Sequence, residues 1–307
     1  MITANAEMRL LQQQARRPTR RLKLAPWETD MTLCIAAAAQ SKDGDPQIVL
    51  CSDELVTTGT ASSQTEVKRQ KLGRSPFVAM FSGVISEARE LLSAYEDYLD
   101  KLSSYADLSV DDWMTHLREP LRLHKKDKVN DLTRRRLALT YEQFMTRKTQ
   151  AQRPDQLFTA VSREIDELTI EVDLLFATFL GGADRRPLIF RERLEQVENH
   201  ENFACIGIGA EAADQALHRR ELVNVLPLPW VLYYVYEAKK MSELAPAVGR
   251  RTSIEVMVPV GSGEPSPSYR SRHVTLEGLD FLESQYKRYG PQPVGDLSIP
   301  SNVRMFW

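Results

Sequence analysis

Short apolar runs separated by polar turns characterise the first part of the chain. Residues 32–39 (TLCIAAAA) and 48–53 (IVLCSD) are nearly continuous apolar segments, and the stretch between them contains Gly, Pro and Asp. A further run, 76–83 (PFVAMFSG), stops at a glycine. Short continuous apolar runs bounded by turn residues are typical of buried strands. We therefore predict that these segments are strands in the interior of the protein.

The pattern changes to a helical period after residue 85. Apolar residues in 86–102 recur at the spacing of one helix face, and Ser86 is the predicted N-cap. The residues predicted to share that face are Leu91, Leu92, Tyr95, Tyr98, Leu99 and Leu102. The middle of the chain, 109–172, is highly charged and mostly helical in pattern. We expect it to form an enlarged helical insertion over about 105–170.

Strand patterns return in the second half. The segments 173–182, 188–193 and 253–260 are apolar and β-compatible. Residues 203–220 combine a strand, a glycine-containing turn and a helix, and 229–244 has the pattern of an apolar-faced helix. Clusters of strands followed by clusters of helices favour antiparallel sheets covered by helices over a parallel βαβ array. The predicted fold class is therefore α+β.

The two ends of the chain differ in composition from the middle. Residues 1–31 form a basic extension without the apolar core of a secretory signal. We interpret them as a disordered or weakly helical extension, as a propeptide, or as a segment that is not translated because the upstream start codon is not used. Residues 261–307 are rich in Ser, Pro and Gly, with one helical pattern, LEGLDFLESQYKRYG, and are expected to form an appendage. The main domain is thus predicted to span 32–260.

Charge and hydropathy exclude several classes of partner. The formal net charge of -2 argues against binding to nucleic acid or to anionic membranes. The longest apolar run, 223–238, is interrupted by Pro227 and Pro229 and is shorter than the roughly 20 residues that span a bilayer. A basic cluster in the middle of the chain is interpreted as a solvated helix face. Its members are Lys125, Lys126, Lys128, Arg134, Arg135 and Arg136.

Cysteine and histidine spacing gives no sign of a metal or cofactor site. Cys34, Cys51 and Cys205 are far apart, have no CxxC spacing and lie in apolar stretches, which suits buried free thiols in a reducing, cytoplasmic compartment. The histidines do not form the HExxH pattern of zinc hydrolases. We predict no metal and no cofactor.

An ordered series of segments resembles a known superfamily. Thr32 before an apolar strand, IVLCSDELVTTG (48–59), the dipeptide at 71–72 and VAMFSGVISEARELL (78–92) are similar to the N-terminal half of proteasome β-subunits. These subunits belong to the N-terminal-nucleophile (Ntn) hydrolases, which include the bacterial HslV-type peptidases. The later segments LLFATFLGGADRRPLIF, FACIGIGAEAADQAL and SIEVMV resemble the second half. The resemblance covers roughly 32–260 without the helical middle.

The resemblance implies a four-layer αββα sandwich and an N-terminal threonine as nucleophile. A threonine hydroxyl is a weak nucleophile and needs a base within hydrogen-bond reach. The amine of a chain terminus, with a pKa of about 7.7–8.0, suits that task near neutral pH. Thr32 matches the nucleophile, and it can act in this way only when nothing precedes it. The implied function is that of a threonine-type peptidase or amide hydrolase.

Other catalytic positions carry over from the same resemblance. Asp53 matches the acidic residue that orients a lysine, and Lys71 matches that lysine. Lys71 is preferred to Lys68 because the family's lysine is usually followed by an aliphatic residue, and Leu72 follows Lys71. Gly83 matches the glycine whose N–H helps to hold the tetrahedral oxyanion.

Several positions depart from the pattern of active members. Ile208 stands where a serine is usual, and Ala247 and Arg250 stand roughly where an aspartate and a serine are expected. Precursors of active members usually carry glycine before the nucleophile, whereas here Asp30 and Met31 precede Thr32. We hypothesise that translation from Met31 followed by methionine removal would expose Thr32. Cys34 as nucleophile, after different trimming, is a minor variant of this hypothesis.

The resemblance also implies partners and leaves two alternative functions open. We expect a homo-oligomer, a ring or stacked rings, that acts on a peptide or protein substrate. The sequence contains no Walker motif, so an unfolding ATPase would be a separate chain. The alternatives to a peptidase are a non-catalytic proteasome-like assembly or scaffold protein, and an Ntn amidase for a small molecule.

Overall fold

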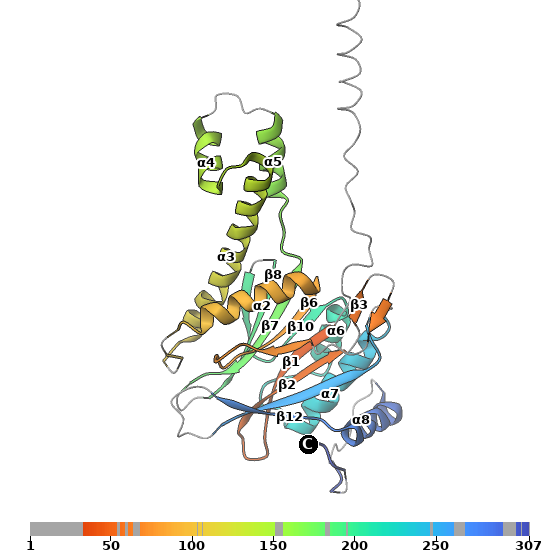
Figure 1. The fold of residues 1–307 in the computed structure, drawn as a ribbon. Helices are drawn as coiled ribbons and strands as arrows, with labels where there is room; N and C mark the ends of the chain where they lie inside the picture. The colour runs from red at the N-terminus through yellow and green to blue at the C-terminus, as the bar shows by residue number, and fades with distance from the viewer. Residues whose placement is uncertain are drawn as a thin grey trace, which may run out of the picture.

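The computed structural model describes residues 33–53, 56–58, 61–63, 68–102, 104–105, 107–150, 156–181, 185–194, 196–245, 248–260, 268–290, 299–301 and 303–306. The predicted N-terminal extension and Thr32 lie outside the described residues. Two five-stranded antiparallel sheets, a short hairpin and a set of helices make up the described part (Figure 1).

Sheet 1 contains the first two predicted strands at its centre. Its order is β10-β1-β2-β11-β12, and every neighbouring pair is antiparallel. The strands are β1 (Leu33–Gln40), β2 (Pro46–Asp53), β10 (Phe203–Gly207), β11 (Thr252–Pro259) and β12 (Tyr269–His273). The predicted Gly- and Pro-containing turn joins β1 to β2, and Gly44 adopts a φ of 85° in it.

Sheet 2 is built around the third predicted strand. Its order is β5-β6-β7-β8-β9, again antiparallel throughout. The strands are β5 (Arg69–Lys71), β6 (Val78–Gly83), β7 (Val172–Phe179), β8 (Pro187–Arg193) and β9 (Gln196–His200). The prediction of antiparallel rather than parallel sheets is confirmed. A separate hairpin consists of β3 (Val56–Thr58) and β4 (Ala61–Ser63).

Three apolar clusters account for the packing of these elements. One cluster, including Cys34, Ile48, Met80 and Leu175, contains residues of both sheets and fills the space between them. A second joins sheet 2 to helices α2 (Ile85–Leu99) and α3 (Val110–Leu137). The third joins sheet 1 to α6 (Ala210–Arg219), α7 (Leu228–Ser242) and α8 (Leu276–Tyr289). The continuous apolar runs of β1 and β2 follow from this burial on both faces.

Helix α2 confirms the predicted amphipathic helix but begins before the predicted cap. Its N-cap is Val84, whose side chain makes no capping bond, so Ser86 is not the N-cap. Gly83 explains the shift, because it has a φ of 113° and ends β6 directly before the helix. The chain therefore turns from strand to helix at Gly83, and the carbonyl of Val84 accepts the first bond from the Ala88 amide.

The predicted helical insertion forms an arm that projects from the sheets (Figure 1). Helix α3 begins with a complete capping box between Ser109 and Asp112 and extends beyond the body. At its far end it contacts α4 (Tyr141–Gln150) and α5 (Gln156–Asp166), which share a small core of Phe144, Phe158 and Val161. The arm is thus attached to the body mainly through the first half of α3, which packs on α2 and β9.

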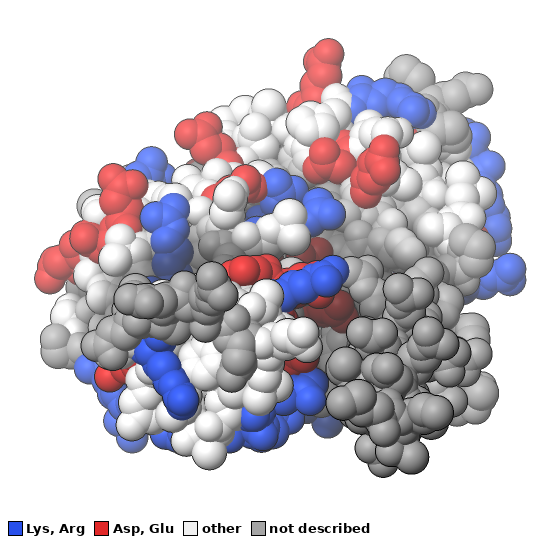
Figure 2. Space-filling view, turned by 90° about the horizontal axis from the view of Figure 1, so that it is seen from above, with Lys and Arg blue, Asp and Glu red and all other residues white. Residues whose placement is uncertain are grey.

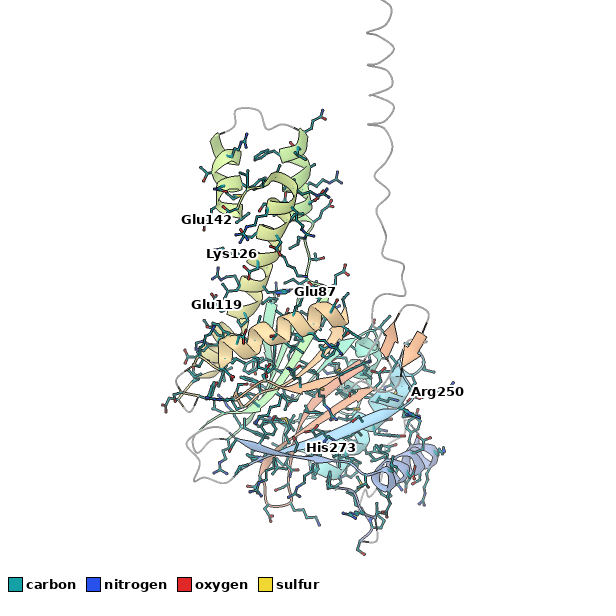
Figure 3. All side chains as sticks on the ribbon, viewed as in Figure 1. Glu87, Glu119, Lys126, Glu142, Arg250 and His273 are labelled. Atoms are coloured by element: carbon teal, nitrogen blue, oxygen red, sulfur yellow. The ribbon has the colours of Figure 1, made fainter. Side chains whose placement is uncertain are left out.

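Charged side chains cover the arm in pairs of opposite sign. Lys126 lies 4.0 Å from Glu142, and both are labelled in Figure 3. Arg122 lies 2.6 Å from Glu119. Arg136 pairs with Glu164 at 3.2 Å. Viewed from above, Lys and Arg side chains and Asp and Glu side chains are both spread over the described part of the visible face (Figure 2). Three members of the basic cluster, Lys126, Lys128 and Arg136, thus have an acidic partner on this helical surface.

The C-terminal part is more closely integrated than an appendage. Strand β12 belongs to sheet 1, where it pairs with β11. Helix α8 begins at the Thr275 cap, and its Leu282 joins the core shared by sheet 1 and α7. Met305 is buried in the same core. In the described part of the chain, no helix has both the length and the apolar character needed to cross a bilayer.

Candidate functional site

A fully buried carboxylate lies at the end of strand β2. Asp53 is 0% exposed and accepts hydrogen bonds from three directions. Its Oδ1 accepts from the Leu33 amide at 3.1 Å and from Lys68 Nζ at 2.8 Å. Its Oδ2 accepts from the Gly249 amide at 2.7 Å. Burying a charged group is costly unless it is paired and hydrogen-bonded, and this set of donors meets that requirement.

Lys68, rather than Lys71, is the lysine that meets Asp53. The Lys68 side chain is 2% exposed and lies just before β5, whereas Lys71 is exposed at the end of that strand. Selecting a lysine by the aliphatic residue after it points to Lys71, but the tertiary structure decides which ammonium group approaches Asp53. We refer to the ion-paired side chains as the Asp53–Lys68 pair.

A second buried ion pair fixes the strand next to Lys68. Arg69 Nη1 lies 2.9 Å from a Glu255 carboxylate oxygen, and Arg69 Nη2 donates to Ser253 Oγ at 2.9 Å. Arg69 belongs to sheet 2, and both partners belong to β11 of sheet 1. The arginine therefore links the two sheets beside the Asp53–Lys68 pair.

The start of β1 and the end of β6 face each other across the sheets. The Cys34 thiol donates to the carbonyl of Phe81 at 3.6 Å, which brings the first residues of β1 close to the strand that ends at Gly83. A Cβ on Gly83 would lie 2.1 Å from the Glu171 carbonyl oxygen, so only glycine fits there. Asp53 and Gly83 thus lie at the ends of two strands, β2 and β6, that each contact the first residues of β1.

The predicted nucleophile lies outside the described residues. The adjoining residue, Leu33, is described, and its backbone amide is the group that binds Asp53 Oδ1. The peptide nitrogen bonded to residue 32 therefore lies at the Asp53–Lys68 pair. This proximity arises from β1 and β2 being neighbours, with Cys34 opposite Ser52 in the register.

Cys34 lacks the features of a reactive thiol. It is completely buried, and this burial raises its pKa to about 12, with the Lys68 charge opposing the rise. A thiol with such a pKa is protonated at neutral pH, whereas nucleophilic cysteines need a lowered pKa. Cys51 is buried in the same way, and its pKa is also raised to about 12.

The glycine turn after β10 borders the same region. Gly207 pairs with Leu33 in the register, and the following Ile208 is 54% exposed. A Cβ on Gly209 would lie 2.8 Å from a Val248 methyl group and 3.0 Å from Ser242 Cβ, so the close packing of this turn requires glycine. A pocket of about 490 Å³ adjoins the turn, lined in part by Arg191, Arg193 and Asp214.

The segment before β11 contributes backbone rather than side-chain groups. Of the two departures in this segment, Ala247 lies outside the described residues and Arg250 has an exposed side chain. The Gly249 amide, which the sequence reasoning missed, donates to Asp53, and the Arg250 carbonyl accepts from Lys239. No sequence motif marks a backbone amide, so only the packing of this segment identifies it. The described residues contain no cluster of three or more metal-ligating side chains.

Comparison with known proteins supports the fold but no sequence family. No family model matches the chain, and no curated protein matches it either. Among solved structures, the chain is similar to the Anbu (Gly-1) mutant from Hyphomicrobium sp. strain MC1, with a TM-score of 0.53 and 14% sequence identity. The alignment covers 84% of this chain and 95% of that chain. At this identity the likeness establishes a shared fold.

Proposed function

We propose that the chain is a threonine-type amide hydrolase of the proteasome-like superfamily, with Thr32 as nucleophile once residues 1–31 are removed. The observation that carries the proposal is the buried Asp53–Lys68 pair, whose carboxylate also binds the amide of Leu33. The likeness to the Anbu structure supports the proposal at the level of the fold. The corresponding architecture is a four-layer αββα sandwich with an added helical arm.

The proposed reaction uses the threonine as both nucleophile and base. The free amine of Thr32 takes the hydroxyl proton as the oxygen attacks the carbonyl carbon of an amide substrate. The C–N bond breaks, the leaving amine takes up the proton, and water then hydrolyses the ester that remains. The Lys68 charge keeps the pKa of the nearby amine low, so the amine is unprotonated near neutral pH. The Gly83 N–H is assigned to the oxyanion.

The Lys68 assignment replaces the expectation for Lys71. A lysine influences a neighbouring amine most strongly when its charge is close and buried, because charge effects weaken with distance and with solvent screening. The Lys68 ammonium is buried at Asp53, whereas Lys71 is exposed on β5. We therefore assign the catalytic residues as Thr32, Asp53, Lys68 and Gly83.

A non-catalytic assembly protein is the second candidate. Ile208 and Arg250 occupy positions where the resembled family usually carries polar supporting groups, and Ile208 is 54% exposed beside the turn that pairs with Leu33. In this alternative the Asp53–Lys68 pair has a structural role and takes no part in catalysis. Both candidates share the expectation of a proteasome-like oligomer, which we propose to be a ring or stacked rings that acts in the cytoplasm, with any ATPase as a separate partner.

The mature N-terminus and the hydroxyl of Thr32 test the proposal. When the full 307-residue chain is expressed in cells, mass spectrometry of the purified protein is expected to show a chain that begins at Thr32. Such material should cleave members of a fluorogenic peptide panel and react with a peptide vinyl sulfone. Thr32→Ala should abolish both activities, while Thr32→Ser keeps measurable turnover. Full activity in Thr32→Ala, or activity in protein that retains residue 1, would contradict the proposal.

A further inference from the structure

A fully buried lysine outside the proposed reaction lies close to the site. Lys239 of α7 is 0% exposed, which is rare for lysine. Its Nζ donates to the carbonyl of Arg250 at 2.7 Å and forms an ion pair with Glu243. Burial lowers the Lys239 pKa, and the Glu243 carboxylate opposes that change. A buried ammonium group with this cost and these partners needs a structural or functional reason.

The backbone that Lys239 holds also binds Asp53. Gly249, directly before Arg250, donates its amide to Asp53 Oδ2 at 2.7 Å. Gly249 is buried, and Val248 packs against Gly209 of the turn beside Leu33. The Arg250 carbonyl and the Gly249 amide belong to adjacent residues. A bond at one of them therefore limits how far the other can rotate.

We infer that Lys239 is a positioning residue for the Asp53–Lys68 pair, acting through the Arg250 carbonyl and the Gly249 amide. The inference rests on the proposed function, because it assigns Lys239 to the support of that site. In this arrangement Lys239 orients the Asp53 carboxylate from the side opposite to Lys68. The Lys68 charge is then held in place at Asp53, next to the Leu33 amide that the same carboxylate binds.

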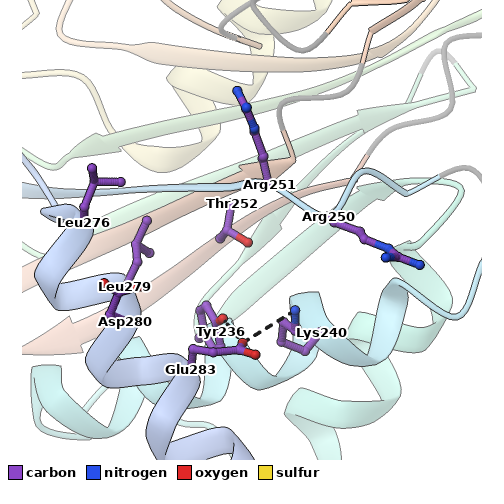
Figure 4. A pocket seen from close by; sticks show the side chains of 9 residues that line it. All are labelled: Tyr236, Lys240, Arg250, Arg251, Thr252, Leu276, Leu279, Asp280 and Glu283. Carbon is purple, nitrogen blue, oxygen red and sulfur yellow. Dashed lines mark hydrogen bonds and ion pairs between the residues drawn. The ribbon is translucent and has the colours of Figure 1, made fainter.

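The neighbouring lysine provides a matched control. Lys240 also pairs with Glu243, at 3.0 Å, but its other partner is Glu283 of α8 at 3.5 Å. Figure 4 shows Lys240 directed toward Glu283 and Tyr236 in a pocket of about 500 Å³ between α7, α8 and residues 250–252. Lys240 thus shares the acidic partner and the helix of Lys239 without the bond to the Arg250 carbonyl.

Lys239→Met removes the charge and the donor while keeping a side chain of similar length. We expect hydrogen exchange of the 245–254 peptide to become faster. We also expect kcat to fall by about 10- to 100-fold, as when a residue that orients a metal ligand is lost. KM should change little. The acidic limb of the rate profile should move to higher pH, because a less constrained Lys68 lowers the amine pKa less. Lys240→Met should leave these quantities near wild type, and Lys239→Arg should restore part of the loss.

Two results would overturn the inference. One is wild-type exchange in the 245–254 peptide of Lys239→Met, and the other is an equal loss of protection in Lys240→Met. If Lys239→Met does not fold, Lys239→Leu, which also removes the donor to the Arg250 carbonyl, serves in its place, and unchanged exchange in that variant has the same meaning. Hydrogen exchange needs no turnover. A wild-type protein without activity would therefore refute the proposed function while the exchange data still decide the role of Lys239.

Discussion

At the scale of single residues, glycine is required at Gly83 for two separable reasons. Its φ of 113° is unfavourable for a side chain, and a Cβ there would meet the Glu171 carbonyl at 2.1 Å. Gly44 has a φ of 85°, but a Cβ at that position would have no atom within 4 Å, so it isolates the first reason. A comparison of the two single alanine variants therefore separates the effect of backbone strain from that of steric overlap.

We predict that Gly83→Ala lowers the free energy of unfolding by more than about 3 kcal/mol, because strain and overlap combine. Gly44→Ala should cost only about 1–2 kcal/mol, the penalty of a left-handed conformation for a side chain. Urea unfolding followed by circular dichroism measures both. Equal losses at the two positions would refute the role of the Glu171 contact.

The two candidate lysines also differ at this scale. Lys68→Met leaves the buried Asp53 carboxylate without its cation, and we expect a loss of about 3–5 kcal/mol. Lys71→Met, at an exposed strand end, should change the free energy of unfolding by less than about 0.5 kcal/mol. Chemical denaturation of the two variants gives the comparison. A larger loss for Lys71→Met would show that the ion pair at Asp53 has been assigned to the wrong lysine.

At the scale of elements, the helical arm depends on its own small core. Phe144 is 1% exposed and stacks on Phe158 with ring centroids 5.2 Å apart, whereas its neighbour Met145 is 38% exposed. The arm core contains few other buried side chains, namely Phe158 and Val161. Because α4 and α5 pack mainly on α3 in the described part of the chain, the arm should open without unfolding the body.

Phe144→Ala should remove hydrogen-exchange protection from α4 and α5, since truncation of a buried phenylalanine costs about 3–5 kcal/mol. Protection in β1, β2 and β6 should remain at the wild-type level. Met145→Ala is the control and should leave the arm protected. Loss of protection in the central strands of Phe144→Ala would show instead that arm and body unfold as one unit.

At the scale of the whole molecule, two histidines on different elements connect stability to pH. Burial lowers the pKa of His124 on α3, assisted by the Lys128 charge. Burial also lowers the pKa of His200 on β9, assisted by Arg191. In both cases the unfolded chain binds a proton at a higher pH than the folded protein. The contribution of the two neutral histidines to the free energy of unfolding is therefore fully present above the unfolded pKa of about 6.5. It is lost as the pH falls toward the lower pKa values of the folded protein.

We predict a lower melting temperature at pH 5.5 than at pH 7.5. The double variant His124→Gln/His200→Gln should show a smaller difference between the two pH values, because its unfolded state no longer takes up those protons. Differential scanning calorimetry at both pH values tests this. An unchanged difference in the double variant would exclude the two histidines as its source.

The sequence by itself determined the elements and their class. Continuous apolar runs predicted β1, β2 and β6, the helical period predicted α2 and α7, and clustering predicted antiparallel sheets. These features depend on local backbone preference and on burial, which a short window of residues records. Strands β5, β9 and β12 were not predicted, because they are short and most of their residues are polar and at least partly exposed.

Only part of the candidate site could be predicted from the sequence. Asp53 and Gly83 ended predicted strands, so their positions were marked locally. The tertiary structure alone decided that Lys68 rather than Lys71 binds Asp53. It also decided that the Gly249 amide donates to the same carboxylate, and that Lys239 donates to the carbonyl of the next residue, Arg250. The physical reason is that a buried charge selects its partners from segments that meet in space, and neither the spacing along the chain nor a short motif encodes that meeting.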